Sequence, residues 1–356
     1  MALRPQETEE NMSSVKIGDI AAPFAFLLLR AAERYGADPD ALLAGVGLDR
    51  AGLADADARV SIPQFMRLGH ACIERTGEPA LGLRMGEHCR ITDLGWPGLL
   101  ALTAPTVGEA LTTLTRFEAL ASRNYRGHSY VEPGPELPGP VFYSIAPYNS
   151  YNLFVVDAVL CWWHKLIQRL SGLEGLVREV HVEFAAPDYH TRYQDIFGVP
   201  VLFGQASNRL VWREEVPALP NRFAEPHLYQ QLLASAEDKL KKQAVTETFR
   251  GRVQHILGPL LHGNTPTIED TAARLGIPDW TLRRKLKDEG TNFQALLDEM
   301  RKDLALGYMR DTALSFGEIA YILGFSTPGA FQRAFKRWTE LTPGAYRRSR
   351  DRKHEE

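Results

Sequence analysis

The sequence predicts an α+β domain followed by an all-α domain that holds two helix-turn-helix motifs joined by a long helix. Two observations predict this fold class. Residues 18–220 mix helical periodicity with short alternating segments that are typical of strands, and residues 246–350 carry one short pattern twice. A charged helix at residues 226–245 is expected to link the two domains. With 356 residues, the chain is long enough for this organisation.

The repeated pattern occupies residues 267–276 and returns at residues 315–324. In each copy an amphipathic stretch ends at a glycine, Gly276 or Gly324, and a basic stretch follows. Glycine adopts the left-handed backbone conformation without a Cβ clash, so it readily ends a helix. Each copy therefore predicts two helices around a tight turn, the outline of a helix-turn-helix whose second helix enters a DNA major groove.

Residues at the helix starts support this prediction. Thr267 and Ser315 can each accept a hydrogen bond from an orphan N–H, and an acidic residue follows three positions later as Asp270 or Glu318. Near the start of each second helix stands a proline, whose missing N–H costs little there: Pro278 and Pro328.

Residues 293–311 are predicted to form the helix between the two copies. Their apolar positions step by three and four: Phe293, Leu296, Leu297, Met300, Leu304 and Tyr308. At 1.5 Å per residue, such a helix is roughly 28 Å long. A rigid spacer of this length suits two recognition helices on one DNA face, about one helical turn (~34 Å) apart.

Basic residues crowd the second helix of each copy, although the whole chain has a formal net charge of −3. The first copy contains Arg283, Arg284, Lys285 and Lys287, and the second contains Arg333, Lys336 and Arg337. A solvated helix face is the ordinary explanation of one basic helix. Because the helix-turn-helix pattern occurs twice here, the placement favours DNA binding over that explanation.

Residues 246–350 resemble the DNA-binding domain of the AraC/XylS family of bacterial transcription regulators. The most specific similarity runs from Ile319 to Trp338 and continues through residues 341–347, around the second motif. Residues 281–290 of the first motif fit the same family. The resemblance implies that the chain is a transcription regulator and that its C-terminal domain is a DNA-binding domain.

The resemblance also implies which residues face DNA. They are Trp280, Thr281, Arg283, Arg284 and Lys287 in the first motif, and Thr327, Gln332, Arg333 and Lys336 in the second. An arginine can make a bidentate contact to guanine, worth about 1–3 kcal/mol of discrimination. Pro328, Gly329 and Ala330 offer no side-chain hydrogen bond to a base, so we expect the second helix to add affinity more than sequence choice. A core aromatic residue is the alternative for Trp280.

Within the N-terminal domain, we expect helices and strands at separate sets of positions. The expected helices are residues 37–48, 61–76, 105–124, 152–170 and 226–243, with Ser61 and Thr106 at two of the helix starts. The expected strands are residues 141–145, 177–184, 199–203 and 208–213. Residues 131–140 are expected to form a Pro/Gly-rich loop, and residues 217–226 a domain boundary.

Residues 20–220 resemble the N-terminal domain of one subgroup of the AraC/XylS family, often described as arabinose-binding-like. The matching features are Leu94 and Gly95, the helix at residues 106–114, and residues 197–204 with Asn208 and Leu210 beyond them. The resemblance implies an effector-sensing and dimerisation domain. The description of the subgroup does not identify the ligand.

A pocket for a small-molecule effector would be lined by aromatic residues, with a few polar groups. The candidates are Tyr143, Tyr151, Trp162 and His181. Aromatic side chains at this density are more often part of a core, so that alternative stays open. Trp162 and Trp163 lie about 100° apart on one helix, and we expect that they do not both face one cavity squarely.

The sequence contains none of the motifs that indicate an enzyme, such as a phosphate-binding loop, a nucleophile elbow or a zinc-protease motif. The three cysteines, Cys72, Cys89 and Cys161, have no metal-ligand spacing and are expected to be reduced and buried. The polar, acidic N-terminus is not typical of a signal peptide, and no apolar run is long enough to span a membrane. We expect no catalytic residue, cofactor or metal, and a cytoplasmic location.

The leading prediction is therefore a transcription regulator that forms homodimers, binds repeated sites on double-stranded DNA, responds to a small-molecule effector and works with RNA polymerase. One alternative is a DNA-binding module fused to a cysteine-dependent alkyltransferase-like repair enzyme. In that case Cys72 is the reactive residue, although no basic cluster surrounds it in sequence. The other alternative is an architectural DNA binder whose N-terminal domain contacts protein.

Overall fold

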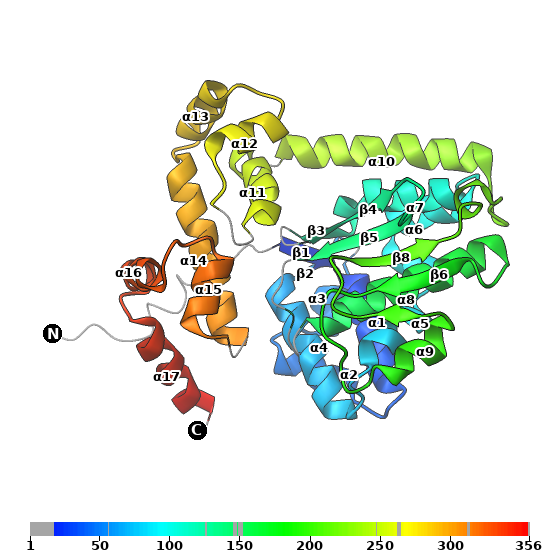
Figure 1. Ribbon diagram of the computed structural model, residues 1–356, viewed down its shortest axis with the longest axis horizontal. Helices are drawn as coiled ribbons and strands as arrows, with labels where there is room; N and C mark the ends of the chain where they lie inside the picture. The colour runs from blue at the N-terminus through cyan, green and yellow to red at the C-terminus, as the bar shows by residue number, and fades with distance from the viewer. Residues whose placement is uncertain are drawn as a thin grey trace. The chain divides into compact units, whose positions relative to one another are not determined.

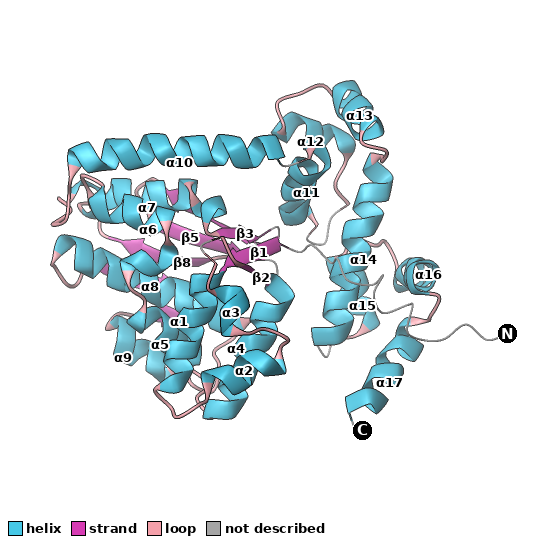
Figure 2. Ribbon diagram, turned by 180° about the vertical axis from the view of Figure 1, so that it is seen from behind, coloured by secondary structure: helices cyan, strands magenta, loops and turns pink. Residues whose placement is uncertain are grey.

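The computed structural model describes residues 18–55, 57–124, 127–144, 148, 152–246, 248–261, 265–311 and 314–354. Two compact units are present: the N-terminal unit is Ile20–Thr248, and the C-terminal unit begins at Phe249. Mixed helices and strands make up the first, whereas the described residues of the second form helices and their connections (Figures 1 and 2). The predicted fold class, an α+β domain followed by an all-α domain, is confirmed.

The C-terminal unit contains two helix pairs on either side of one long helix. Its helices are α11 (Phe249–Leu260), α12 (Ile268–Arg274), α13 (Asp279–Asp288), α14 (Phe293–Asp311), α15 (Phe316–Ile322), α16 (Pro328–Thr339) and α17 (Pro343–His354). The pairs α12–α13 and α15–α16 are the two predicted helix-turn-helix motifs, and α14 has the predicted bounds of the spacer. Leu282, Leu286, Phe331 and Phe335 are fully buried in one core, as apolar positions on recognition helices should be.

Helix caps set the ends of both motifs as the sequence predicts. Ser315 and Glu318 form a complete capping box: the Ser315 hydroxyl accepts from the Glu318 N–H at 3.2 Å, and the Glu318 carboxylate accepts from the Ser315 N–H at 2.8 Å. Thr267 accepts from the Asp270 N–H at 3.0 Å. The carboxylate of Asp270, one methylene shorter than glutamate, accepts from the Thr267 hydroxyl at 2.6 Å, and this bond takes the place of the reciprocal backbone bond.

A buried arginine joins the spacer helix α14 to the turn of the second motif. Arg301 is 6% exposed, and its Nε donates to the Leu323 carbonyl at 2.8 Å. Its Nη2 donates to the Gly324 carbonyl at 3.0 Å, and the guanidinium lies 4.8 Å from the centre of the Phe325 ring. These carbonyls end α15, where helix geometry leaves them without intrahelical partners and with partial negative charge. The guanidinium therefore satisfies the helix end and holds the turn that precedes α16.

The N-terminal unit contains two sheets. The larger has the order β4-β5-β8-β6-β7 and consists of β4 (Gly127–Glu132), β5 (Gly139–Ser144), β8 (Asn208–Trp212), β6 (Val177–His181) and β7 (Val201–Leu202). The pair β6–β7 is parallel, and the other neighbours are antiparallel. The smaller has the order β2-β1-β3 and consists of β2 (Arg59–Ser61), β1 (Gly18–Ala21) and β3 (Ser122–Asn124).

The helices of this unit pack against the sheets and against one another. They are α1 (Ala22–Glu33), α2 (Pro39–Gly45), α3 (Arg50–Leu53), α4 (Ile62–Thr76), α5 (Leu81–His88), α6 (Trp96–Thr103), α7 (Val107–Arg116), α8 (Leu153–Ser171), α9 (Thr191–Phe197) and α10 (Pro226–Thr246). Single-turn 3₁₀ helices are η3 (Ile91–Leu94), η4 (Glu118–Leu120) and η5 (Val216–Ala218). Helix α8 packs against β5 and β8, and α10 runs beside α6 (Figure 1).

Two glycines let α5 and α8 approach each other closely. A Cβ at Gly82 would lie 2.4 Å from the Phe154 carbonyl oxygen, and one at Gly86 would lie 2.5 Å from that of Ala158. Both distances are shorter than van der Waals contact, so any larger residue at either position would push the helices apart. The position of α8 in the core therefore depends on the absence of side chains on this face of α5.

Two expectations for the N-terminal unit are wrong. The helix expected over residues 105–124 begins as predicted, because Thr106 accepts from the Glu109 N–H at 3.1 Å, but it ends at Arg116. Residues 122–124 instead form β3, where the Ala21 N–H donates to the Ala121 carbonyl at 2.8 Å, and this pairing with a distant segment overrides local helix propensity. The loop expected over residues 131–140 is shorter than predicted: it spans residues 133–138, because residues 131–132 belong to β4 and residues 139–140 to β5.

Arg301→Met should destabilise the C-terminal unit while leaving the N-terminal unit unchanged. The substitution keeps an apolar stem but leaves two helix-end carbonyls without their donor, at a cost of about 1–3 kcal/mol for each buried group. Hydrogen exchange measured by mass spectrometry on the full chain should show faster exchange in α14–α16 and unchanged exchange in α8. The exposed Arg274→Met is the matched control. Equal exchange in Arg301→Met and Arg274→Met would contradict the role assigned to Arg301.

Candidate DNA interface and ligand cavity

Helix α13 presents all but one of its predicted DNA-contacting side chains to solvent. Trp280 is 59% exposed, which excludes the alternative that it belongs to the core, and Arg283, Arg284 and Lys287 are exposed as well. Thr281 is partly buried on the first turn. The Arg284 guanidinium lies 5.4 Å from the centre of the Trp280 ring, a cation–π distance that orients both side chains on one surface.

Arg283 is held in place by weak ion pairs. Its guanidinium lies 3.6 Å from the Asp279 carboxylate and 3.7 Å from that of Glu269, and all three side chains are largely exposed. Exposed pairs of this kind contribute about 0–1 kcal/mol. A phosphate or a guanine edge can therefore displace these carboxylates at little cost, so the arrangement keeps Arg283 available for a nucleic-acid contact.

Helix α16 has fewer side chains able to hydrogen-bond to DNA in its first turn than α13 has. The Thr327 hydroxyl accepts from the Ala330 N–H at 3.1 Å and so serves as the helix cap. Pro328 and Gly329 follow it, and the exposed polar side chains come later, at Gln332, Arg333 and Lys336. The structure thus brings all the predicted residues of the second motif to the surface, but the first turn carries no free hydrogen-bonding side chain.

The N-terminal unit contains an apolar cavity of about 130 Å³, lined mainly by residues of α1, α4, α5, α8 and η4. Six aromatic rings contribute to its wall: Phe24, Phe65, Phe142, Phe154, Trp162 and Trp163. A cavity of about 150 Å³ with apolar walls holds a molecule the size of benzene. The volume and lining therefore suit a compact ligand with a hydrophobic body.

Both tryptophans of α8 line this cavity, although they lie about 100° apart on the helix. The lining residues of α8 form a stripe two residues wide: Phe154, Val155, Ala158, Val159, Trp162 and Trp163. Neighbouring residues on a helix are roughly 100° apart, so a stripe of this width spans that angle. Of the four predicted effector contacts, Trp162 is in the wall of this cavity.

The other three predicted effector contacts are not placed in this wall. His181 is in β6 and does not line the cavity; its Nε2 lies 3.1 Å from the Glu179 carboxylate. Tyr151 lies outside the described residues, as does the side chain of Tyr143, although its backbone is in β5. Cavity residues that the sequence did not indicate come from distant segments, such as Phe24 in α1 and Glu118 in η4.

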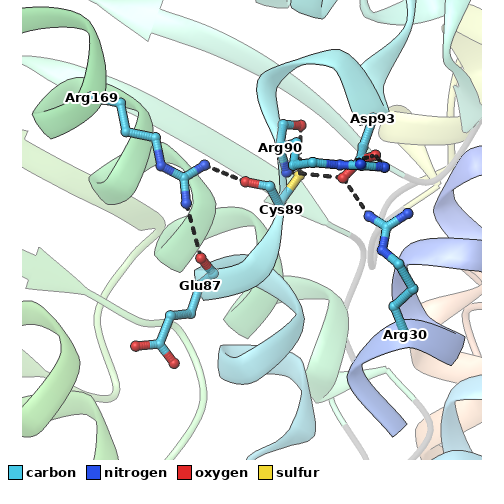
Figure 3. Close-up of polar contacts among 6 residues, drawn as sticks. All are labelled: Arg30, Glu87, Cys89, Arg90, Asp93 and Arg169. Carbon is cyan, nitrogen blue, oxygen red and sulfur yellow. Dashed lines mark hydrogen bonds and ion pairs between the residues drawn. The ribbon is translucent and has the colours of Figure 1, made fainter. Parts of the chain in front are cut away.

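A network of polar contacts fixes the corner between α5 and η3, where Cys89 and Leu94 line the cavity (Figure 3). Arg169 of α8 donates to the carbonyls of Cys89 and, at 3.0 Å, Glu87, which end α5. Asp93 accepts from Arg30 at 2.5 Å and from the backbone N–H of Arg90 at 2.9 Å. Helices α1, α5 and α8 are therefore tied together just behind the wall.

Glu118 is the carboxyl group in the cavity wall. It stands on η4, directly after the point where α7 ends, and its carboxylate accepts from the Ser129 N–H at 2.7 Å and lies 3.2 Å from the Ser129 hydroxyl. Ser129 also lines the cavity. Burial raises the pKa of Glu118 to about 7, and the two Ser129 hydrogen bonds offset part of that rise.

Comparisons with known proteins cover both units. Residues 36–221 match the arabinose-binding domain of AraC transcription regulators, and residues 271–349 match a helix-turn-helix domain. The chain is 29% identical over 330 residues to the ornithine utilization regulator of Pseudomonas aeruginosa, which covers 92% of this chain and 96% of that protein. It is 26% identical over 276 residues to the regulator VqsM of the same organism, covering 75% and 83% respectively.

The chain belongs to the AraC family of transcription regulators. It is a DNA-binding regulator with an N-terminal domain of the arabinose-binding type, as the sequence predicts. A solved structure, the AraC-like regulator CdpR from Pseudomonas aeruginosa, aligns with 76% of this chain and 87% of its own at 27% identity, with a TM-score of 0.39. Among the helices that the structure describes, none combines the length and apolar character needed to cross a membrane.

The alternative of a cysteine-dependent enzyme has no support in this AraC-family chain. Cys72, Cys89 and Cys161 are free and buried. Burial raises the pKa of Cys72 to about 12 and also raises the pKa of Cys89 and Cys161. A thiol in such surroundings stays protonated at neutral pH, whereas a nucleophilic cysteine requires a lowered pKa.

The three thiols of the native regulator should therefore react slowly with iodoacetamide at neutral pH. Mass spectrometry should find little alkylation of the folded protein over a period in which the denatured chain is alkylated at all three cysteines. The denatured chain is the internal control for reagent and time. Fast, selective alkylation of Cys72 in the folded protein would contradict the buried, protonated state described above.

Proposed function

We propose that this AraC-family regulator contacts repeated DNA sites through the exposed faces of α13 and α16, and that a small molecule in the N-terminal cavity controls the binding. The observation that supports this control is an apolar, aromatic-lined cavity with one carboxyl in its wall. A core that served stability alone would be filled, since protein interiors are close-packed and voids are destabilising.

The surface chemistry of α13 and α16 supports the DNA contacts. Base edges are read by bidentate side chains, and phosphates are bound by point charges and arginine forks. Arg283, Arg284 and Lys287 on α13 offer both kinds of contact, and the exposed Trp280 adds a flat apolar surface beside them. On α16, Gln332 and Arg333 are the base-reading candidates, and Lys336 suits a phosphate.

Helix α10 supports the link between cavity and DNA-binding domain. It is the last helix of the N-terminal unit, it precedes α11 in the chain, and it contacts the elements next to the cavity. Gln243 donates to the Ala119 carbonyl of η4 at 3.4 Å, and Glu237 pairs with Arg116 at 2.7 Å. A ligand that moves η4 therefore changes the surface on which α10 rests. Control follows only when the ligand binds one arrangement of α10 more tightly than another.

The remaining partners follow from this mode of action. We place the protein in the cytoplasm, where bacterial DNA and RNA polymerase are. A homodimer suits repeated half-sites because each copy of the DNA-binding domain can bind one repeat. The N-terminal unit is the proposed dimerisation domain, and RNA polymerase is the proposed target at the promoter. No cofactor, metal or membrane enters the mechanism.

Arg283→Ala should weaken specific DNA binding by about 5- to 150-fold, the equivalent of the ~1–3 kcal/mol of one bidentate base contact. The preferred site is first selected from a random DNA library with the wild-type chain, and affinities are then measured by fluorescence anisotropy at physiological salt. Lys241→Ala, an exposed cation on α10, is the control and should bind as the wild type does. No preference of the wild type for any selected site over random DNA would overturn the proposed DNA contacts.

Val159→Phe should abolish ligand binding by filling the cavity. Val159 lines the cavity from α8 and keeps accessible surface there, so the larger ring has space to enter. A thermal-shift screen of the full chain against small metabolites should find ligands that stabilise the wild type by mass action and leave Val159→Phe unchanged. Leu173→Phe, an exposed apolar position after α8, should respond as the wild type does. Equal stabilisation of Val159→Phe and wild type would place the ligand elsewhere.

A further inference from the structure

In the part of the cavity wall that the structure describes, the Glu118 carboxyl has no cationic side chain beside it. Among the described residues in its wall, the ionisable groups are Glu118 and the Cys89 thiol, and no lysine, arginine or histidine is present. The bonds from Ser129 use part of the capacity of the Glu118 carboxylate, which can accept about four hydrogen bonds. An ionised carboxylate in apolar surroundings is costly without a partner of opposite charge. Protonation relieves part of this cost, since burial raises the pKa of Glu118 to about 7, and a ligand cation in the cavity would stabilise the ionised carboxylate.

The aromatic rings in the same cavity wall favour a cation over a neutral donor. The negative face of an aromatic ring attracts an ammonium group within about 6 Å, and the attraction strengthens when the pair is desolvated. Six such rings line this small cavity together with one carboxylate. An ammonium on a hydrophobic body can pair with Glu118 and rest its apolar part on the rings at the same time.

We propose that the effector of this cavity is a compact hydrophobic amine whose ammonium group pairs with Glu118 while its apolar body packs against the aromatic wall. The proposal rests on the proposed function, since it names the ligand class for the same cavity. Glu118 becomes a specificity-determining residue, and η4, which carries it, is the element that contacts α10 through Ala119.

The same wall disfavours two other ligand classes. A carboxylate ligand would bring a second negative charge beside Glu118 and would find no cation in the described wall. A sugar carries hydroxyls around its whole ring, and each would need a hydrogen-bond partner, because an unpaired buried hydroxyl is costly. The side chains of Glu118, Ser122 and Ser129 are too few for that purpose. The description arabinose-binding thus names the domain type and does not fit the chemistry of this cavity.

The test compares three probes of nearly equal shape on the full chain by isothermal titration calorimetry at mildly alkaline pH. Benzylamine carries the cation, benzyl alcohol is its neutral counterpart, and benzoate carries the opposite charge. Benzylamine should bind at least about tenfold more tightly than benzyl alcohol, since a desolvated ion pair is stronger than a neutral hydrogen bond. Benzoate should bind most weakly.

Glu118→Gln removes the negative charge but nearly preserves the shape of the side chain, so it tests the ion pair alone. The glutamine oxygen can still accept from Ser129, but the negative charge is gone, so benzylamine should lose about tenfold or more in affinity while benzyl alcohol is unchanged. Retained benzyl alcohol binding shows that the variant is folded. Glu214→Gln, an exposed acid outside the cavity, should match the wild type for every probe.

The possible outcomes test the proposed amine ligand separately from the proposal that the cavity is the effector site. Benzyl alcohol or benzoate binding as tightly as benzylamine, with binding lost in Val159→Phe, would overturn the amine and leave the cavity as the effector site. An amine preference that persists in Glu118→Gln would also overturn the pairing. Binding of none of the three probes to the wild type would overturn both the amine and the cavity.

Discussion

A short helix ends with carbonyl groups that have no partner within the helix, and burial makes that lack costly. Distant side chains supply the missing donors at three helix ends here. Arg301 donates to the end of α15, Arg169 to the end of α5, and Asn221 to the carbonyls of Ala101, Leu102 and Ala104 at the end of α6. The first of these bonds holds the turn before α16 and the second holds the cavity corner, so both candidate sites depend on the same constraint.

The position at which α7 ends also determines part of the cavity wall. Because the chain leaves the helix after Arg116, Glu118 stands beside Ser129 of β4, and residues 122–124 pair with β1. A continuous helix would have no such contact between Glu118 and Ser129. The same break exposes the Ala119 carbonyl to Gln243 of α10. One irregular segment thus contributes the acid of the cavity wall and a contact to the helix that leads to the DNA-binding domain.

Sequence reasoning succeeded where the determining contacts are local. The capping box at Ser315, the left-handed Gly276 and Gly324, and the bounds of α14 all depend on residues within one or two turns, and all are confirmed. It failed where the structure depends on contacts between segments that are distant in sequence. Strands β1–β3 are three or four residues long, too short for a periodic signal, and the cavity wall combines residues from α1 to α8 that no spacing connects. Sequence analysis proposed Trp162 because aromatic residues cluster on its helix. Nothing in the sequence indicated that Glu118 lines a cavity.

The two recognition helices differ in the side chains that they offer to DNA bases. Helix α13 begins with an exposed indole and two exposed guanidinium groups within its first two turns, and its charge partners are weak enough to be displaced. Helix α16 begins with a threonine hydroxyl already used as a cap, followed by proline and glycine. Pro328 has no N–H and the Ala330 N–H is bonded to the Thr327 hydroxyl, so this start offers few hydrogen-bond donors to DNA. We therefore expect sequence discrimination to depend mainly on α13 and α16 to contribute mainly affinity.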